Sequence, residues 1–427
     1  MVIKKLSLKT NMTWTLAGTI IYSLTQWLLL IVIAKLGTPE MVGKYALGLA
    51  VTAPIIMLTE MRLRLTLITD AKGSYGFHHY LGTRIVSVLI SFLIIIAIVL
   101  VIGYEFQTSM IIILIGIAKL PESVSDILHG KLHKYERMDF INISSVLKGI
   151  LTVIVFSWIL YTTNSLMMAI IGQILVWTVI LLFFDCLIAK RYGSIKPSFN
   201  VTKMKQLVKL TIPLGIMGLL TTVNTNLPSY LVEYFLGKEE LGYFVALFYI
   251  LLAGNRVVNA LRQPAAPLLA SLYEEGNLKG FNNLLLKLLG IGAIIGVLGL
   301  ITTYIFGEFL LSIIYTPSYA AYSGLFVAIM VSGLFSYPAA FLANGVIATR
   351  HFKSQPYLAG LWVLTSVIGC IVFIPKLGVY GAAIAVIIAS FVELISLYLV
   401  LVRIIKNDRN STDHHNENAS LVKKVMY

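Results

Sequence analysis

The sequence has little charge, because only 12% of its 427 residues are Asp, Glu, Lys or Arg, whereas about 25% is usual in soluble domains. Hydrophobic residues make up 58%, and the mean hydropathy is +0.88. This composition excludes a soluble globular protein and predicts a polytopic membrane protein. Cysteine is also scarce. Cys186 and Cys370 lie in apolar stretches without CxxC or Cys/His spacing, so we expect no disulfide framework, no metal and no cofactor.

Two further absences limit the function. The chain has no GxxxxGK[S/T] motif, so ATP bound to this chain would not drive transport. An ion gradient, the membrane potential or consumption of the substrate outside would supply the energy instead. The loops predicted to be external are short, the longest lying around residues 307–322. They leave no room for the external catalytic domain of a glycan polymerase or ligase, so the sequence predicts a transporter and not an enzyme.

Apolar segments long enough to cross a bilayer recur along the chain. The fourth segment is exceptional, because it must continue through Pro121, Glu122 and Asp126 to reach full length. We predict twelve spans, at about 12–34, 43–64, 84–103, 108–129, 141–161, 166–188, 208–235, 241–262, 284–306, 322–346, 356–375 and 379–403.

The distribution of Lys and Arg predicts the orientation of these spans. Twelve spans place both termini on one side, and 27 of the 33 basic residues fall in segments on that side. Basic residues mark cytoplasmic segments, so we expect a multi-pass protein of the cytoplasmic membrane with both termini in the cytoplasm. The net charge of +14 then reflects topology, and nucleic acid is not an expected partner.

A short polar interruption occurs twice. LGTPEMVGKYAL begins at Leu36, and LGKEELGYFVAL begins at Leu236. Six spans separate the copies, so both face the same side of the membrane, as in a parallel repeat. The 200-residue offset also aligns Arg62 with Arg262. We therefore predict an all-α membrane protein built from two six-helix bundles, at 1–200 and 201–405, followed by a polar cytoplasmic tail at 406–427.

The fourth predicted span carries a stripe of ionisable residues. Spacings of 3, 4, 3 and 4 place them on one helical face, which cannot face lipid. The stripe is either a structural ladder of ion pairs or a cavity wall that relays protons. Its members are Lys119, Glu122, Asp126, His129 and His133.

Charged residues also lie in the second and twelfth predicted spans. Glu60 and Arg64 are four residues apart and can pair, whereas Arg62 points to another face of the helix. Glu393 lies deep in the last span, where it is either buried and protonated or part of a coupling-ion site. Lys148 is close enough to the cytoplasmic side to extend its ammonium to the interface.

The seventh and eighth predicted spans hold polar residues at depth. Pro213 and Pro228 bracket a polar run that includes Asn224 and Asn226, which suits a cavity lining or hydrogen bonding between helices. The eighth span places Asn255, Asn259 and Arg262 on one face beside Arg256, and Pro264 and Pro267 are expected to disrupt its helix.

Several stretches between residues 10 and 405 carry a family resemblance. They include LAVTAPIIMLTEMRLRLTLITD, KLPESVSDILHGKLHKYERMD, NTNLPSYLVEYFLGKEELGYFVALFYI and IPKLGVYGAAIAV. In content and order these stretches resemble the polysaccharide transporter family, the Wzx-like oligosaccharide flippases of the MOP superfamily. The resemblance implies a MATE-like transporter fold with a cationic central cavity. It also implies movement of undecaprenyl-pyrophosphate-linked sugar repeat units between leaflets for surface polysaccharide biosynthesis, with lipids and other polysaccharide-assembly proteins as partners.

The resemblance also suggests roles for individual residues. Arg62, Arg64, Asp70 and Arg84 match the family's first basic cluster, whereas Ser229 and Leu268 stand where the family often has Arg. A MATE-type antiporter for drugs or cations is the alternative function, and it would need the acidic residues to dominate the cavity. The candidate substrate-binding residues are Arg62, Arg64, Arg84, Arg256, Arg262, Asn224, Asn226, Asn255 and Asn259, and those for ion coupling or proton relay are Glu122, Asp126, His129 and Glu393.

Overall fold

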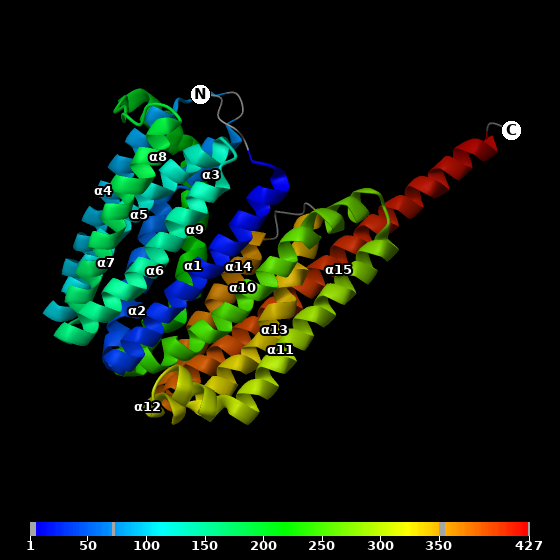
Figure 1. Ribbon diagram of the computed structural model, residues 1–427. Helices are drawn as coiled ribbons and strands as arrows, with labels where there is room; N and C mark the ends of the chain where they lie inside the picture. The colour runs from blue at the N-terminus through cyan, green and yellow to red at the C-terminus, as the bar shows by residue number, and fades with distance from the viewer. Residues whose placement is uncertain (1–5, 71–72, 350–354, 426–427) are drawn as a thin grey trace. The chain divides into compact units, whose positions relative to one another are not determined.

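The computed structural model describes residues 6–70, 73–349 and 355–425, and the elements that it assigns there are all helical. Contacts divide the chain into two compact units, at residues 1–246 and 247–427. The helices of the first unit are α1 (Leu8–Leu36), α2 (Pro39–Glu60), α3 (Leu63–Thr69), α4 (Phe77–Ile102), α5 (Phe106–Lys134), α6 (Met138–Thr163), α7 (Leu166–Ile180), the π-helical turn η1 (Leu181–Asp185), α8 (Cys186–Arg191) and α9 (Val201–Leu236) (Figure 1).

The second unit is also helical. Within it α11 packs against α13, and α13 and α14 both pack against α15 (Figure 1). The division between units falls inside α10, so the bundle boundary at residue 200 and the tail from residue 406 remain predictions. The helices are α10 (Lys238–Glu274), which begins in the first unit, α11 (Leu278–Ile314), α12 (Pro317–Ala320), α13 (Ser323–Ala348), α14 (Gln355–Leu377) and α15 (Val379–Val425).

Local chemistry explains where α2 begins. The hydroxyl of Thr38 accepts a hydrogen bond from the amide of Met41, and Pro39 occupies the first helical position. Threonine satisfies a free amide at a helix start, and proline fits there because its missing N–H needs no partner. Glu40 in the first turn complements the positive end of the helix dipole. The repeated polar segment thus encodes a helix start.

Eleven helices among the described residues are long and apolar enough to cross a membrane. The helix α5 is not one of them, although it has 29 residues, because its ionisable residues lower its hydropathy. It nevertheless packs against α2, α4 and α7 within the first unit. The predicted all-α membrane fold is confirmed, and a twelfth span formed by α5 stays a prediction.

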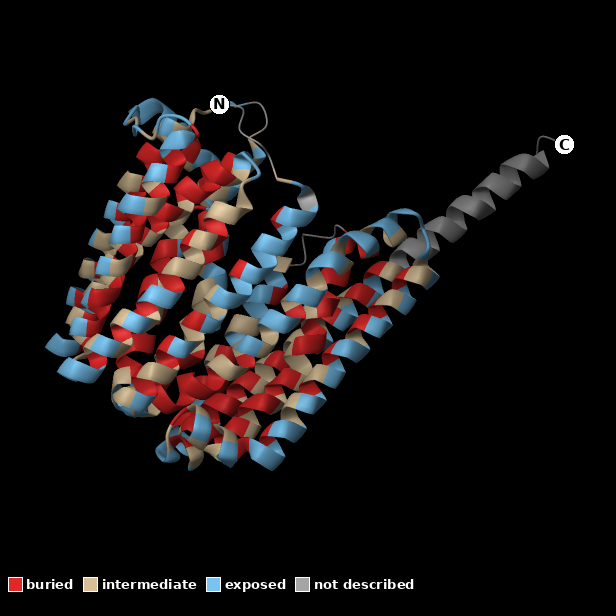
Figure 2. Ribbon diagram, in the orientation of Figure 1, coloured by how far each residue is buried: buried red, intermediate tan, exposed pale blue. Residues whose placement is uncertain are grey.

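The pattern of buried and exposed residues is the one expected for helices packed in a membrane. Figure 2 shows buried residues gathered on the inner faces of the helices and exposed residues on the outer faces. On α4, Leu93, Leu100 and Val101 are largely exposed, whereas Ser87 and Ser91 are buried. Apolar side chains outside and small polar ones between helices are typical of helices that face lipid.

The path of two helices differs from the sequence prediction. The span predicted at 43–64 lies within the candidate membrane span Pro39–Thr69, but its helix is interrupted, because α2 ends at Glu60 and Met61 and Arg62 separate it from α3. Conversely, α10 runs through Pro264 and Pro267 to Glu274, so the expected disruption is wrong. Neighbouring helices and local adjustment tolerate proline in such spans, whereas packing around residue 61 imposes a break that proline does not mark.

The two repeated segments touch each other within the first unit. A Cβ atom at Gly43 would overlap the carbonyl oxygen of Lys238, and one at Gly242 would overlap that of Pro39. The contact is reciprocal, and its partners are 199 residues apart, as are the starts of α2 and α10. Glycine is needed here because two helix backbones approach closely.

Candidate functional site

The helix α5 places polar side chains toward three different neighbours. Ser123 and Asp126 face α2, α3 and α4; Ser125 and His129 face α6 and η1; Glu122 faces α1. The predicted stripe on this helix is therefore divided among separate clusters. Since each cluster pairs opposite charges, most of the intramembrane charge of the first unit is neutralised locally.

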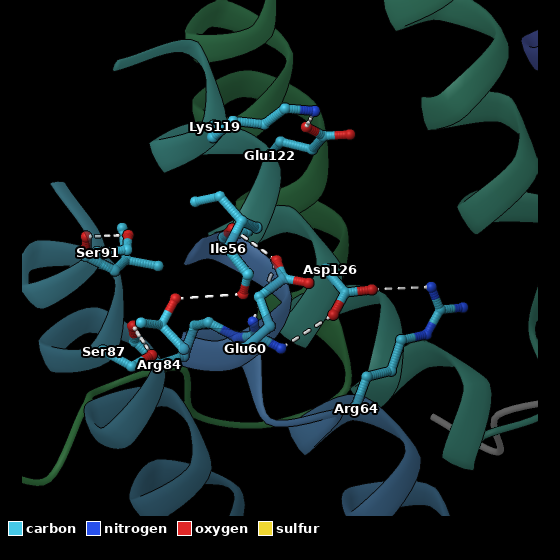
Figure 3. A network of polar contacts seen from close by, with 12 residues as sticks. Ile56, Glu60, Arg64, Arg84, Ser87, Ser91, Lys119, Glu122 and Asp126 are labelled. Carbon is cyan, nitrogen blue, oxygen red and sulfur yellow. Dashed lines mark hydrogen bonds and ion pairs between the residues drawn. The ribbon is translucent and has the colours of Figure 1, made fainter. Parts of the chain in front are cut away.

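The first cluster joins four charged side chains (Figure 3). Arg84 lies between two carboxylates, with Nη1 3.2 Å from Glu60 Oε1 and Nη2 3.0 Å from Asp126 Oδ2. Asp126 Oδ1 accepts a second hydrogen bond from Arg64 Nη1 at 3.1 Å, and Ser123 Oγ donates to Glu60 at 2.6 Å. The cluster holds two positive and two negative charges, so it is neutral.

This geometry corrects one prediction. Arg64 pairs with Asp126 and not with Glu60, whose partner is Arg84. The residue Arg84 is 0% exposed, so its guanidinium is held inside the bundle and has no open side for a substrate. Sequence spacing could not reveal this, because helical periodicity predicts only neighbours on the same helix.

A second cluster surrounds Asp185. Its Oδ2 accepts hydrogen bonds from Lys148 Nζ at 2.7 Å and Ser125 Oγ at 2.6 Å, and its Oδ1 lies 3.2 Å from His129 Nε2. Asp185 ends the π-helical turn η1, and such turns re-aim side chains, often at functional sites. The lysine is buried, so the prediction that it reaches the interface is wrong.

Sequence reasoning overlooked Asp185. It stands in the apolar stretch LLFFDCLI within the sixth predicted span. An acidic residue in such a stretch is costly unless it is paired, and that cost was the signal that could have identified it. The partner Lys148 lies 37 residues away in the sequence, so pattern alone could not supply it.

A third cluster contains Glu122. Lys119 Nζ donates to Glu122 Oε2 at 2.6 Å, and Tyr22 OH donates to Glu122 Oε1 at 3.5 Å. The ammonium of Lys119 also lies 5.7 Å from the centroid of the Trp177 ring. In Figure 3 this pair stands apart from the Arg84 cluster. The relay roles predicted for Glu122, Asp126 and His129 thus remain predictions, with each side chain in a different cluster.

Arg62 differs from the other basic residues of this region. It is exposed, and no carboxylate among the described residues lies within 4.0 Å of its guanidinium. Met61 and Arg62 both have φ of 49°, the left-handed region. Non-glycine residues there cost about 1–3 kcal/mol each and persist only where the surroundings enforce them. Arg62 is therefore a cation held in an exposed position by the fold.

The polar run of α9 satisfies much of its own hydrogen bonding. Thr221 and Thr222 donate to carbonyls one turn earlier at 2.8 Å, and Asn226 Nδ2 donates to the carbonyl of Thr222 at 2.8 Å. Asn224 and Asn226 are partly buried. Their proposed contact with substrate stays a prediction.

The second unit holds the remaining predicted residues. On α10, Arg256 is exposed, whereas Asn255, Asn259 and Arg262 are partly buried. Asn344 Nδ2 of α13 donates to the Arg262 carbonyl at 2.9 Å. The last of the predicted residues, Glu393 on α15, is partly buried and close enough to the Arg262 guanidinium for their charges to interact.

The reciprocal glycine contact also changes the alignment of these arginines. Counted from the starts of α2 and α10, the register is 199 and not 200. Arg62 then corresponds to Leu261, and Arg262 corresponds to Leu63. The single residue Gly237 links α9 to α10, whereas Gly37 and Thr38 link α1 to α2. This one-residue difference accounts for the shift, so Arg62 and Arg262 are not equivalent by position.

Asp70 follows α3 in the loop before α4, outside the helices long enough to span a membrane. Its carboxylate accepts hydrogen bonds from the amides of Ser74 and Tyr75, and Lys134 donates to its backbone carbonyl at 2.9 Å. Slight burial raises the pKa of Asp70, but the two amides and the charge of Lys134 outweigh it, so the pKa is lowered. The carboxylate of Asp70 therefore stabilises the conformation of this loop.

Comparisons with known proteins identify the family of this chain. The family model described as polysaccharide biosynthesis protein matches residues 8–273. A capsular polysaccharide biosynthesis protein, CapF from Staphylococcus aureus, is 30% identical over 396 residues, covering 92% of this chain and 99% of that protein. The chain belongs to the polysaccharide biosynthesis protein family. The family resemblance predicted from the sequence is thus confirmed.

Several solved transporter structures share the fold of this family member. An inward-facing multidrug resistance MATE transporter matches with a TM-score of 0.72 and 15% identity, over 91% of this chain and 96% of the other. The lipid II flippase MurJ also matches with a TM-score of 0.72, at 14% identity over 91% and 87%. A MOP superfamily transporter from Pyrococcus furiosus gives 0.59 at 15% identity over 93% and 94%. The MATE-like fold is thereby confirmed, and these likenesses concern fold alone.

Proposed function

We propose that this protein translocates a lipid-linked oligosaccharide, carried on undecaprenyl pyrophosphate, across the cytoplasmic membrane for surface polysaccharide assembly. Membership of the polysaccharide biosynthesis protein family and the MOP superfamily fold support a transporter in this pathway. The observation that carries the proposal is Arg62, an exposed guanidinium without a carboxylate partner among the described residues. A guanidinium binds phosphate through two parallel hydrogen bonds, which suits a pyrophosphate group.

The charge arrangement opposes a MATE-type antiporter. A transported organic cation, or a coupling cation, needs an unneutralised carboxylate in the transport path. In the first unit, however, Glu60 and Asp126 are bound by Arg84 and Arg64, Asp185 by Lys148, and Glu122 by Lys119. Most of these acidic groups are thus paired, whereas Arg62 has no carboxylate partner in the described part of the chain and can attract an anion.

The helix connections oppose a membrane polymerase or ligase. On the side predicted to be external, the described links are Gly37–Thr38, Gly103–Glu105, Asn164–Ser165, Gly237 and Gly378, together with a longer segment at 315–322. No segment there could hold a catalytic domain within the described residues. The mechanism that this architecture supports is alternating access, with the lipid pyrophosphate attracted to Arg62 from the predicted cytoplasmic side.

A cell-based experiment tests this proposal. An Arg62→Ala variant, and the Arg62→Ala, Arg262→Ala double variant, should accumulate the lipid-linked intermediate in the inner leaflet and reduce surface polysaccharide. Lys279→Ala is a matched control, because Lys279 is an exposed basic residue at the start of α11. Normal surface polysaccharide in the double variant, with protein levels equal to wild type, would remove the proposed role of these arginines.

The alternative function has its own readout. Cells that lack their other exporters and carry this protein should show no added tolerance to cationic drugs. If tolerance rises while the lipid-linked intermediate is distributed normally, the protein is an antiporter and the flippase proposal is wrong.

A further inference from the structure

The break between α2 and α3 is unusual in its backbone. Met61 has φ 49° and ψ 22°, and Arg62 has φ 49° and ψ 33°. Side chains with a Cβ atom rarely adopt this region, and glycine or asparagine is the usual choice. Two consecutive residues of other types therefore need firm support on both sides of the break.

Packing supplies the support around Met61. Met61 is 4% exposed and belongs to a buried cluster with Leu63 and Leu67. On α9, a Cβ at Gly215 would lie 3.1 Å from the Met61 side chain, so this glycine leaves room for it. Thr211 Oγ1 also contacts Met61 Sδ at 3.6 Å. The side chain of Met61 is therefore held in place by its neighbours on α3 and α9.

Arg64 supplies the support beyond the break. Its Nη1 donates to Asp126 Oδ1 on α5. The Arg64 side chain is 30% exposed. A Cβ at Gly130 would lie 3.1 Å from Arg64 Cγ, so α3 rests closely on α5 at this glycine. Asp126 is itself held from the other side by the buried Arg84 (Figure 3). Two successive contacts, Arg84–Asp126 and Asp126–Arg64, thus connect the interior of the bundle to α3.

Arg62 lies between these two anchors and takes part in neither. It is exposed, whereas Met61 and Leu63 on either side are buried. The direction in which its side chain leaves the backbone is then set by the left-handed conformation, which depends on the position of α3. Removing the anchor at Arg64 would let α3 shift on α5 and would let the backbone at 61–62 relax to an ordinary conformation.

We infer that Arg64 is a positioning residue, which acts with Asp126 to hold α3 in place and so aims Arg62 at the phosphate of the substrate. This inference rests on the proposed function and deepens it. It reassigns Arg64, which the sequence predicts as a substrate ligand, and leaves Arg62 as the phosphate-binding cation of the first unit.

Binding measurements on the full-length protein in lipid nanodiscs test the inference. The probes are undecaprenyl pyrophosphate and the uncharged undecaprenol. Arg62→Ala should weaken pyrophosphate binding at least about tenfold, as expected for a lost charged hydrogen bond. Arg64→Ala should weaken it too, but the double variant should bind no more weakly than Arg62→Ala alone. Losses that multiply would show that Arg64 is an independent ligand and would overturn the inference.

A conservative variant adds a second criterion. Arg64 makes a single hydrogen bond to Asp126, so Arg64→Lys keeps a cation within reach of that carboxylate and should restore most of the binding that Arg64→Ala loses. If Arg64 instead gripped phosphate through its planar fork, lysine would be a poor replacement. Failure of Arg64→Lys to restore binding, at wild-type thermal stability, would also count against positioning.

A spectroscopic readout separates the inference from the proposed function. A nitroxide attached through Arg62→Cys, with Cys186 and Cys370 replaced by alanine, reports motion at position 62 without any substrate. The line shape should report a more mobile nitroxide in the Arg64→Ala variant. In the Arg64→Lys variant the nitroxide should be as immobile as it is with Arg64 present. Arg64→Gln serves if Arg64→Ala accumulates poorly. An unchanged spectrum overturns positioning, whereas wild-type binding that does not distinguish the two lipids overturns the proposed function alone.

Discussion

Gly43 and Gly242 meet backbone to backbone, each lying against a carbonyl oxygen of the other's helix, those of Lys238 and Pro39. Both glycines lie within the repeated segments, and each is the fifth residue of its helix. Small residues let helices in membranes approach closely, and the contact energy then comes from packing and not from water exclusion. The reciprocity of this contact is the structural counterpart of the repeat in the sequence.

Substituting Gly242 by alanine should destabilise the protein. The added methyl group would overlap a backbone oxygen, which cannot rotate away as a side chain could. Such overpacking costs about 1–3 kcal/mol. Thermal unfolding in detergent measures the effect, and Gly290→Ala is the control, because a Cβ there meets nothing within 4 Å. Equal melting temperatures for the two variants would contradict the contact.

Removing only Lys148 from the Lys148–Asp185 pair should destabilise the protein more than removing both charges. Both residues are buried, at 4% and 1% exposure, so Lys148→Met leaves an uncompensated carboxylate, which costs about 3–5 kcal/mol. The Lys148→Met, Asp185→Asn double variant removes both charges and keeps a carbonyl oxygen that can accept from Ser125, while the amide nitrogen can donate to His129. It should unfold at a temperature nearer to wild type than Lys148→Met does.

An exposed pair provides the comparison. Lys238 Nζ lies 2.9 Å from Glu105 Oε2, and Glu105 is largely open to solvent. Exposed pairs contribute little, so Glu105→Gln should leave the melting temperature almost unchanged. If Lys148→Met were equally mild, the buried cluster would not stabilise the fold.

The sequence predicted most of the membrane spans but not which charged residues pair between helices. Long apolar segments predict the spans, and the repeated polar segments mark two of the turns between them. Arg84 and Asp126 are 42 residues apart, and no local rule joins them. The stripe on α5 was correctly located, but a stripe does not specify which of several neighbouring helices each side chain reaches.

The break at Met61–Arg62 was unpredictable for a different reason. Neither residue is a glycine, proline or asparagine, so the stretch TEMRLRLT reads as continuous helix. Contacts with α5 and α9 enforce the left-handed backbone, and these contacts exist only once the bundle has assembled. Local preference and tertiary packing disagree here, and such disagreements tend to occur at functional positions.

Asp70 should make the loop before α4 sensitive to acid. Its carboxylate has a lowered pKa because it accepts two backbone amides and lies near Lys134. A group with a lowered folded-state pKa stabilises the protein above its unfolded pKa, and the contribution is lost as pH falls through the folded value. Asp70→Asn should therefore melt below wild type at neutral pH, and the difference should shrink as the pH falls from neutrality through the unfolded pKa of Asp, about 3.9. A constant difference across this range would show that the charge of Asp70 does not matter.

Arg84 provides the sharpest test of which basic residues touch substrate. It is fully buried between Glu60 and Asp126, so Arg84→Gln should lower stability by about 3–5 kcal/mol, because two carboxylates lose their shared partner. The Glu60→Gln, Arg84→Gln double variant leaves Asp126 paired with Arg64 and should recover much of that loss. Melting temperature and accumulation in the membrane report both effects.

The same double variant shows whether Arg84 has only a structural role or also binds the substrate. If Arg84 only neutralises the cluster, the double variant should bind undecaprenyl pyrophosphate within about threefold of wild type, since a lost charged contact would cost at least about tenfold. Stable protein that has lost this binding would make Arg84 a ligand, despite its burial. Because Glu60→Gln alone keeps Arg84 paired with Asp126, that single variant separates the loss of the carboxylate from the loss of the guanidinium.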